Sequence, residues 1–278
     1  MALGSSCLVG GRGVFHGMPV LGALAPWRTV FVCLGLLGLP VITLVATVRE
    51  PQRRNRAVSG PARSIPLRDV MVRIRALRAF LLPLYVAMGL SNICDYALLS
   101  WTPTLLSRRF GLGAGEIGTV LGAVVVLAGV LGAAGAGIVA DRLVRRGVEK
   151  GRLKLAYFTL IVGAIGTLVA AAPVAGLVFL LVGVWILAST SGQAAGLTIL
   201  QEMVPNEIRG LSVSISSLVN IGLGLALGAA LPAAVGLYIL HDTQAMGLAM
   251  TLVALPAAVL SILLYRRAMT GINEVVTA

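Results

Sequence analysis

The stretch "VLGAVVVLAGVLGAAGAGIVADRLVRRG", from Val120 to Gly147, shows the pattern that decides the fold. Its first 21 residues carry no charge, and the run then stops at Asp141, followed by Arg142, Arg145 and Arg146. An apolar run of 18 or more residues is a candidate transmembrane helix. A helix of a soluble protein can end in the same way, so the composition of the whole chain has to decide.

The composition favours a membrane protein. Of the 278 residues, 58% are hydrophobic and only 12% are charged, and the mean hydropathy is +0.98. A soluble domain carries about 25% charged residues, so this chain has too few to cover a water-facing surface. Its net charge of +12 comes from cations that cluster between apolar runs, which fits membrane topology rather than nucleic-acid binding. We therefore expect a polytopic, all-α membrane protein.

Seven apolar runs predict seven membrane spans. They lie at about Thr29–Val48, Phe80–Leu105, Ile117–Ala140, Leu155–Ala172, Ala175–Leu200, Leu211–Ala234 and Ala245–Tyr265. The start of the chain is short, glycine-rich and interrupted by Arg12, and no basic region precedes it, so a cleavable signal peptide fits poorly. We expect an N-terminal segment (1–28), an isolated transmembrane helix (29–48), a basic loop (49–79) and a six-helix region (80–278).

The cations between the spans predict the orientation. Eighteen arginines and lysines fall in one set of alternating loops, from Arg49 to Arg267, and the other set holds only Arg12, Arg28, Arg108 and Arg109. Cytoplasmic loops carry such an excess of positive charge. The chain is therefore expected in the inner or plasma membrane of a cell. Its N-terminus is expected outside and its C-terminus in the cytoplasm.

The end of the longest loop predicts an amphipathic helix. Five apolar residues share one helical face, and three arginines lie on the other side: Leu67, Val70, Met71, Ile74 and Leu77 against Arg68, Arg75 and Arg78. This pattern is typical of an interfacial helix. A simple lead-in to the next span explains it better than a partner-binding role.

Four stretches resemble the major facilitator superfamily, in particular the C-terminal part of its transporters. "PWRTVFVCLGLLGLPVITLVATVREPQRR" resembles the sixth family helix, and "SWTPTLLSRRFGLGAGEIG" resembles the end of the seventh and the approach to the eighth. "GIVADRLVRRG" resembles the loop motif between the eighth and ninth helices. "VPNEIRG" and "NIGLGLALG" resemble the loop before the eleventh helix and that helix itself. The combination is similar to spinster-like and anion:cation symporter-like members.

The resemblance implies secondary transport of a small, organic solute by alternating access, as a symporter with a coupling proton or cation. It also implies a cytoplasmic gating motif, whose residues here are Gly137, Asp141, Arg142, Arg145 and Arg146. The family usually has a glycine two residues after the Asp-Arg pair, and Val144 stands there in this chain.

The family fold has twelve helices in two halves with the site between them, and the resemblance extends only from about Pro26 to the C-terminus. The glycine-rich start is interpreted as a remnant of the fifth helix. The hypotheses are a truncated gene product, a misassigned start codon or a split transporter. A missing N-terminal half or a homodimer would then be the partner, beside membrane lipid. A remnant that transports nothing, or a membrane protein that only binds a partner, is the alternative.

Asp95 is the strongest candidate for a solute- or ion-binding residue. It is the only acid deep inside an expected span, where an ionised carboxylate is costly unless it faces a cavity or a partner. Asn92 lies on the same helical stripe and Tyr96 lies beside it. A hydrogen-bonded packing role for Asp95 remains an equal alternative.

Gln193 and Asn220 are the other candidates, because their amides carry more polarity than the surrounding serines and threonines, which commonly bond to their own helix. By the resemblance, the helices that hold Asp95 and Gln193 line the central pathway, and the helix that holds Asn220 flanks it. Rows of small residues predict close helix packing in two spans: Gly118 and Gly122, then Gly129, Ala133 and Gly137, in one, and Gly224 and Gly228 in the other.

Other kinds of site have little support in the sequence. The three cysteines and two histidines show no metal-ligand spacing, and the sequence holds no phosphate-binding loop or nucleophile elbow. We therefore expect neither an enzyme nor a cofactor. A retinal protein of seven spans is excluded because the last span has no lysine for a Schiff base.

Overall fold

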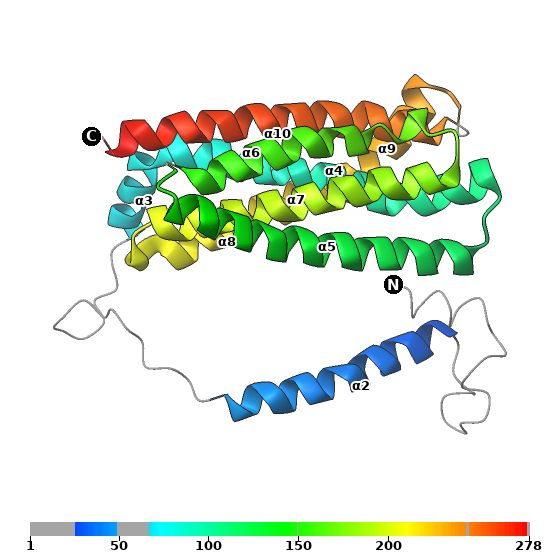
Figure 1. Ribbon diagram of the computed structural model, residues 1–278, viewed down its shortest axis with the longest axis horizontal. Coiled ribbons are helices and arrows are strands. Elements are labelled where there is room, and N and C mark those ends of the chain that lie inside the picture. Colours follow the sequence, from blue (N-terminus) through cyan, green and yellow to red (C-terminus); the bar gives the residue numbers. More distant parts are fainter. Residues whose placement is uncertain (1–25, 49–66, 149, 243–244, 277–278) are drawn as a thin grey trace. The chain divides into compact units, whose positions relative to one another are not determined.

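The computed structural model describes residues 26–48, 67–148, 150–242 and 245–276, and every regular element among them is helical, as the sequence predicts (Figure 1). The α-helices are α2 (Pro26–Thr47), α3 (Leu67–Ala76), α4 (Arg78–Phe110), α5 (Ala114–Arg145), α6 (Gly151–Ala164), α7 (Ala175–Met203), α8 (Asn206–Leu223), α9 (Ala229–Ala234) and α10 (Met246–Val276). The 3₁₀ turns are η1 (Ile165–Thr167) and η2 (Val169–Ala171), and the π-helical turns are η3 (Gly224–Gly228) and η4 (Val235–Ile239).

The chain divides into two units by its internal contacts. One unit contains α2 and the first part of α5, residues 113–122, and the other contains residues 66–112 and 123–278. The candidate site lies entirely in the second unit. Most of the expected N-terminal segment (1–28) and of the basic loop (49–79) lies outside the described residues.

Within the described part of the chain, five helical segments are long and apolar enough to cross a membrane, where the sequence predicts seven. They are Arg78–Phe110, Ala114–Arg145, Ala175–Met203, Asn206–Ile239 and Met246–Ile272. Within the expected span Thr29–Val48, the apolar helical stretch is Leu34–Thr47, which is shorter than these five segments. The expected span Leu155–Ala172 is the other exception, because its helix α6 ends at Ala164 and continues as 3₁₀ turns.

The early end of α6 has a packing cause. A Cβ atom at Gly166 would lie 2.7 Å from the backbone nitrogen of Trp185, so only glycine allows η1 to approach α7 this closely. Thr251 of α10 provides hydrogen-bond partners for the backbone of these 3₁₀ turns. Its Oγ1 donates to the carbonyl of Thr167 (3.0 Å) and accepts from the Ala170 amide (3.2 Å). Non-helical backbone at membrane depth needs such partners.

The segment from α8 to η4 runs as one long helix interrupted by two π turns. The expected span Leu211–Ala234 lies inside it. The first π turn, η3, begins at Gly224, where α8 packs on α4. π turns inside α-helices are frequent at functional sites.

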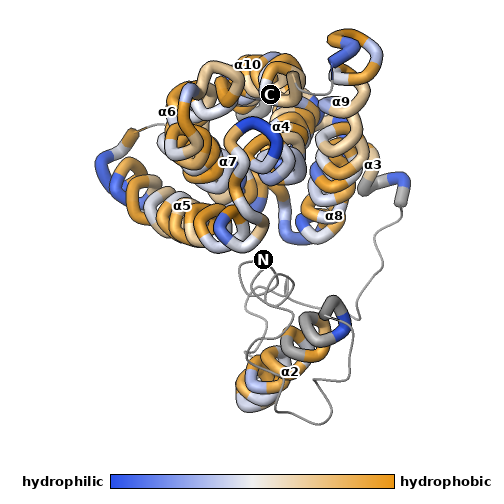
Figure 2. Tube along the Cα trace, turned by 90° about the vertical axis from the view of Figure 1, so that its right-hand side faces the viewer, coloured by the Kyte–Doolittle hydropathy of each residue, from blue (hydrophilic) through white to orange (hydrophobic). Residues whose placement is uncertain are grey.

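α4 is the central helix of the bundle, and it packs against α10, α8 and α7 (Figure 2). Hydrophobic residues dominate the bundle helices in this view. Many of these residues face outward: four on α5, Val126, Leu127, Val130 and Leu131, are each 62% exposed. Apolar surface of this extent suits contact with lipid rather than water.

Candidate functional site: a polar cluster between α4, α7 and α8

Asp95 lies near the middle of α4, and its carboxylate is held by two donors from α7. The indole Nε1 of Trp185 and the hydroxyl of Ser189 both donate to Oδ1 of Asp95, each over 2.7 Å. Trp185 is fully buried and Ser189 is 2% exposed, so both donors are fixed by packing. Charge-assisted hydrogen bonds of this length stabilise an acid that the apolar surroundings disfavour.

Three amide side chains form a second group one helical turn away. Asn92 of α4 donates through Nδ2 to Oδ1 of Asn220 on α8. Asn220 in turn donates to Oε1 of Gln193 on α7 (3.1 Å), and Gln193 donates to the carbonyl of Met88 on α4 (3.1 Å). The structure therefore brings Asn92, Gln193 and Asn220 together from three helices.

Helical periodicity makes the two groups neighbours. Asn92 and Asp95 are three residues apart on α4, and Ser189 and Gln193 are four residues apart on α7. Residues at these spacings lie one above the other on a helix. We name the combination of Asp95, Ser189, Gln193, Asn92 and Asn220 the polar cluster. It can exchange a proton or bind a cation at the carboxylate, and it can donate and accept hydrogen bonds at the amides.

Tyr96 has a packing role. Its ring lies against the π turn η3, where a Cβ atom at Gly224 would be 3.0 Å from Cδ2 of Tyr96 and 2.8 Å from Cβ of Asn92. Within the described residues, no hydrogen bond joins the Tyr96 hydroxyl to the polar cluster. Gly224 and Gly228 form a close helix contact here, as the sequence predicts.

The other predicted glycine row is wrong in its register. A Cβ atom added at Gly129 or Gly137 on α5 would have no heavy atom within 4 Å, and the close approach to α7 occurs at Gly132. The hydroxyl of Ser191 donates to the carbonyl of Gly132 over 2.9 Å. With Gly129, Gly132, Gly135 and Gly137 all present, several faces of α5 carry glycines, so their spacing alone does not identify the packed face.

Trp185 and Ser189 were not predicted as partners of Asp95. A Trp in an apolar span has a default role as an interfacial anchor or core residue, and Ser most often bonds to its own helix. The sequence pattern that could have predicted these donors is the i, i+4, i+8 spacing of Trp185, Ser189 and Gln193, which places all three on one face of α7.

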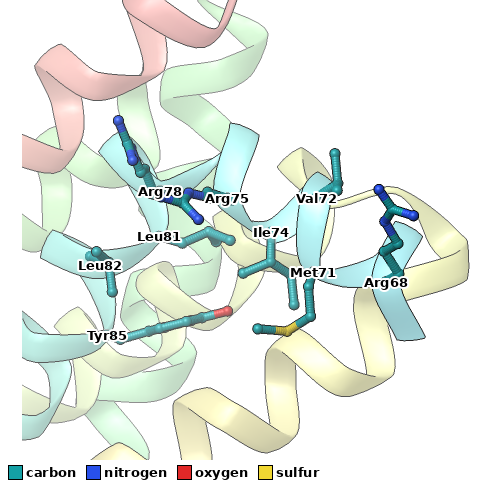
Figure 3. Close-up of a pocket in the computed structure, with 9 residues that line it drawn as sticks. All are labelled: Arg68, Met71, Val72, Ile74, Arg75, Arg78, Leu81, Leu82 and Tyr85. Atoms are coloured by element: carbon teal, nitrogen blue, oxygen red, sulfur yellow. The ribbon is translucent and has the colours of Figure 1, made fainter. Parts of the chain in front are cut away.

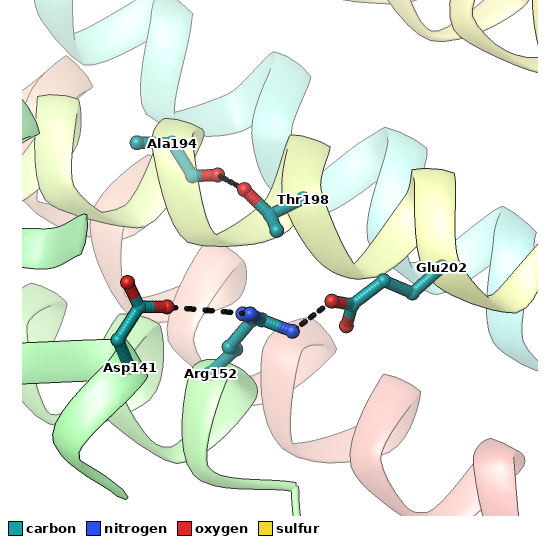
Figure 4. A network of polar contacts seen from close by, with 5 residues as sticks. All are labelled: Asp141, Arg152, Ala194, Thr198 and Glu202. Atoms are coloured by element: carbon teal, nitrogen blue, oxygen red, sulfur yellow. Dashed lines mark hydrogen bonds and ion pairs between the residues drawn. The ribbon is translucent and has the colours of Figure 1, made fainter. Parts of the chain in front are cut away.

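Asp141 takes part in a separate network at the basic end of the bundle (Figure 4). Arg152 at the start of α6 lies between two carboxylates, Asp141 at the end of α5 (Nη2 to Oδ1, 3.5 Å) and Glu202 at the end of α7. Its side chain is 17% exposed, whereas those of Asp141 and Glu202 are 63% and 44% exposed. The network ties the ends of three helices together.

The structure places the remaining motif residues outside this network. Gly137, Arg142, Arg145 and Arg146 are exposed, and no ion pair joins these three arginines to a described acid. The ion pairs of this network instead involve Arg152 and Glu202, which the sequence did not single out. The sequence feature that could have indicated this pair is an arginine and an acid at span ends that face the same side of the membrane.

The two ion pairs of Arg152 are expected to differ in strength. A double-mutant cycle of thermal unfolding in detergent, with alanine at each position, should give a coupling of about 0.5–1 kcal/mol for Arg152 and Glu202 and less for Arg152 and the more exposed Asp141. Glu207, which pairs with Arg73 instead (3.6 Å), serves as the control and should show no coupling to Arg152. A larger coupling to Asp141 than to Glu202 would contradict this geometry.

No group of three or more His, Cys, Asp or Glu side chains in the described residues is arranged to hold a metal ion.

Comparisons with known proteins agree with this architecture. The model of the family described as "Major Facilitator Superfamily" matches residues 1–229. A crystal structure of a bacterial homologue of the human lysosomal transporter Spinster, inward-facing and unoccupied, is similar with a TM-score of 0.59 and 19% identity. The occupied inward-facing structure of such a homologue gives a TM-score of 0.51 and 17% identity. No curated protein matches the chain.

These likenesses show the fold, and they cover nearly the whole chain but not the whole of the solved proteins. The aligned region covers 97% of this chain and 65% of the unoccupied structure, and 99% and 63% for the occupied one. The chain therefore spans less than two thirds of the length of either solved protein.

Proposed function

Because this chain belongs to the major facilitator superfamily, we propose that it serves secondary active transport of a small organic solute by alternating access. The single observation that carries the proposal is the polar cluster. Asp95 lies in the middle of a membrane-spanning helix, is held by two donors and lies beside three linked amides. Polar groups at this depth are costly, and apolar packing of the bundle does not require them, so they indicate a functional site.

We assign Asp95 the role of the ion- or solute-linked residue. Both donors reach Oδ1, and Oδ2 can take up a proton or meet a cation or a cationic solute group. Gain or loss of that charge changes how strongly the carboxylate holds Trp185 and Ser189 of α7. This gives a physical link between occupancy at Asp95 and the contact between α4 and α7, and coupling to a proton or cation gradient follows from it.

Asn92, Gln193 and Asn220 are proposed to orient the solute. Their amides offer donors and acceptors from three helices at one place, and a bound polar group can replace the bonds they make with one another. Tyr96 is proposed to set the spacing between α4 and η3 at this point.

The gating role is proposed for the network around Asp141, with Gly137, Arg142, Arg145 and Arg146 of the sequence motif beside it. Asp141, Arg152 and Glu202 join α5, α6 and α7 at one end of the bundle, so their ion pairs hold these ends together in one state. Exposed pairs of this kind contribute little free energy each, which suits contacts that form and break in a transport cycle.

The domain boundaries are part of the proposal. Residues 80–278 form one wall of the solute pathway, residues 29–48 form a separate transmembrane helix, and residues 49–79 form a basic cytoplasmic connection. The facing wall of the pathway comes from further helices of the fold, on the same polypeptide, on a separate N-terminal half or on a second copy.

The excess of cations supports a cytoplasmic location for the end of the bundle that holds α3 and the C-terminus. The variant Arg146→Cys is made in a chain whose three native cysteines are replaced by serine, and a membrane-impermeant thiol reagent applied to cells should fail to label it until the membrane is permeabilised. Labelling of intact cells would place this loop outside and contradict the orientation.

The transport proposal is tested with the purified full chain. Thermal stability in detergent is first screened against a panel of organic anions, organic cations and sugars, and a stabilising compound is then used, radiolabelled, for counterflow into liposomes that contain the chain. Stabilisation with counterflow supports transport. Absence of both, in a chain that is folded and inserted, would overturn the proposal and favour a membrane protein that only binds a partner.

A further inference from the structure

The elbow between α3 and α4 contains a pocket of about 400 Å³ that the proposed transport does not use (Figure 3). It lies in the second unit, at the basic end of the bundle. Three arginines line it, Arg68 and Arg75 from α3 and Arg78 from the start of α4. The rest of the lining is apolar apart from one phenol, that of Tyr85.

The arginines of the pocket have no anionic partner within the described part of the chain. Arg73, which lies on the same short helix but does not line the pocket, pairs with Glu207. The salt bridges formed by the described residues involve neither Arg68, Arg75 nor Arg78. Figure 3 shows the Arg68 side chain directed away from Arg75 and Arg78. The guanidinium groups of Arg75 and Arg78 favour an anion with several acceptor oxygens.

The phenol of Tyr85 provides an independent sign of a ligand. Its side chain is 3% exposed, and its hydroxyl makes no hydrogen bond that meets normal geometry. The Ser212 hydroxyl on α8 is its polar neighbour and lacks a hydrogen bond as well. Figure 3 shows the Tyr85 hydroxyl directed toward Met71 and Ile74, on the pocket side. A bound acceptor would give the Tyr85 hydroxyl a hydrogen bond of normal geometry in place of its loose contact with Ser212.

The apolar part of the pocket is open to the outside of the bundle. Met71 and Leu82 are each 58% exposed, and Val72 is 61% exposed. A site with arginines at one edge and exposed apolar side chains at the other matches a molecule with an anionic head and a hydrocarbon tail.

We propose that this pocket binds one anionic phospholipid from the surrounding membrane leaflet. The headgroup phosphate lies at Arg75 and Arg78, an ester oxygen accepts from the Tyr85 hydroxyl on the apolar side, and the acyl chains run past Met71 and Leu82. The bound lipid fixes the angle between the interfacial helix α3 and the membrane-spanning helix α4. The proposal rests on insertion of the chain in a membrane and is independent of transport.

A lipid fits better than a free phosphate ion or an acidic protein. A free ion would leave the exposed apolar surface of Met71, Val72 and Leu82 in contact with water. The pocket lies where the basic end of the bundle meets the bilayer in the proposed orientation, a region that presents anionic headgroups at high local concentration.

Native mass spectrometry of the full chain, released from mixed micelles, tests the proposal. The probe is palmitoyl-oleoyl-phosphatidylglycerol, with phosphatidylcholine of the same chains for comparison. The native chain should bind one phosphatidylglycerol in preference to phosphatidylcholine. The variant Arg75→Gln/Arg78→Gln should bind it about thirtyfold more weakly, and the nearly isosteric Tyr85→Phe about tenfold more weakly.

The variant Arg266→Gln/Arg267→Gln is the matched control, because it removes the same charge from exposed positions of α10 outside the pocket. Its affinity for the tight-binding lipid should stay native. Equal weakening in the control would show general attraction to a basic surface and overturn the proposal. Native affinity in both pocket variants would overturn it too, as would displacement of the lipid by millimolar glycerol 3-phosphate, which would identify a headgroup-only anion site.

Discussion

Replacement of Asp95 by asparagine is expected to abolish solute uptake driven by a proton or cation gradient, with a loss of at least about 100-fold, while the chain stays folded. The amide keeps the volume of the carboxyl group and can still accept from Trp185 and Ser189 through Oδ1. It cannot take up a proton or carry a charge, which is the property that the proposed coupling requires. Gradient-driven uptake into liposomes and thermal stability in detergent measure the two effects separately.

Asp242→Asn provides the matched control, because it makes the same chemical change at an exposed position outside the spans. Its transport should equal that of the native chain. If Asp95→Asn transports at the native rate, Asp95 is a hydrogen-bonded packing residue, and the role assigned to it is wrong. If Asp95→Asn loses its folded state, Asp95→Glu is used, and a transport loss without unfolding is then expected.

Gly228→Ala is expected to lower the free energy of unfolding by about 1–3 kcal/mol, because overpacking a tight helix contact costs energy of this order. A methyl group at this position would lie 2.6 Å from the carbonyl oxygen of Ile93 and 2.7 Å from Cβ of Tyr96. Both obstacles are backbone or backbone-proximal atoms of α4, so α4 and η3 must move apart. Thermal unfolding in detergent measures the change.

Gly222→Ala is the control on the same long helix. Nothing lies within 4 Å of its added Cβ, and a helical Gly-to-Ala change is favourable by roughly 0.5–1 kcal/mol. The two substitutions should therefore shift the melting temperature in opposite directions. Equal shifts would show that the contact between η3 and α4 is not close in the folded protein.

The membrane class and most of the helices could be predicted from the sequence because hydropathy over 20 residues is a strong signal. Five predicted spans, all except Thr29–Val48 and Leu155–Ala172, lie within long apolar helices of the described residues to within one residue. Hydropathy carries no information on local backbone geometry. The 3₁₀ turns after Ala164 and the π turn η3 lie at Gly166 and Gly224, which make close contacts with other helices.

The candidate site was predictable in part. Asp95, Asn92, Gln193 and Asn220 stand out because polar side chains are costly in an apolar span. The structure joins the three amides by hydrogen bonds one helical turn from Asp95. Trp185 did not stand out, since its donor role depends on which face of α7 meets α4. Gly132 and Arg152 did not stand out either, because their partners, Ser191 and Glu202, belong to a helix distant in sequence.

The central claim is that the polar cluster is where the solute binds, and thiol protection tests it most directly. Gln193→Cys and Arg146→Cys are made in a chain whose three native cysteines are replaced by serine. The rate of reaction with a small cationic methanethiosulfonate is measured with and without the stabilising solute. The account predicts that the solute slows the reaction at position 193 at least about tenfold and leaves the rate at position 146 unchanged. Equal rates at position 193 with and without a solute that stabilises the chain would contradict it.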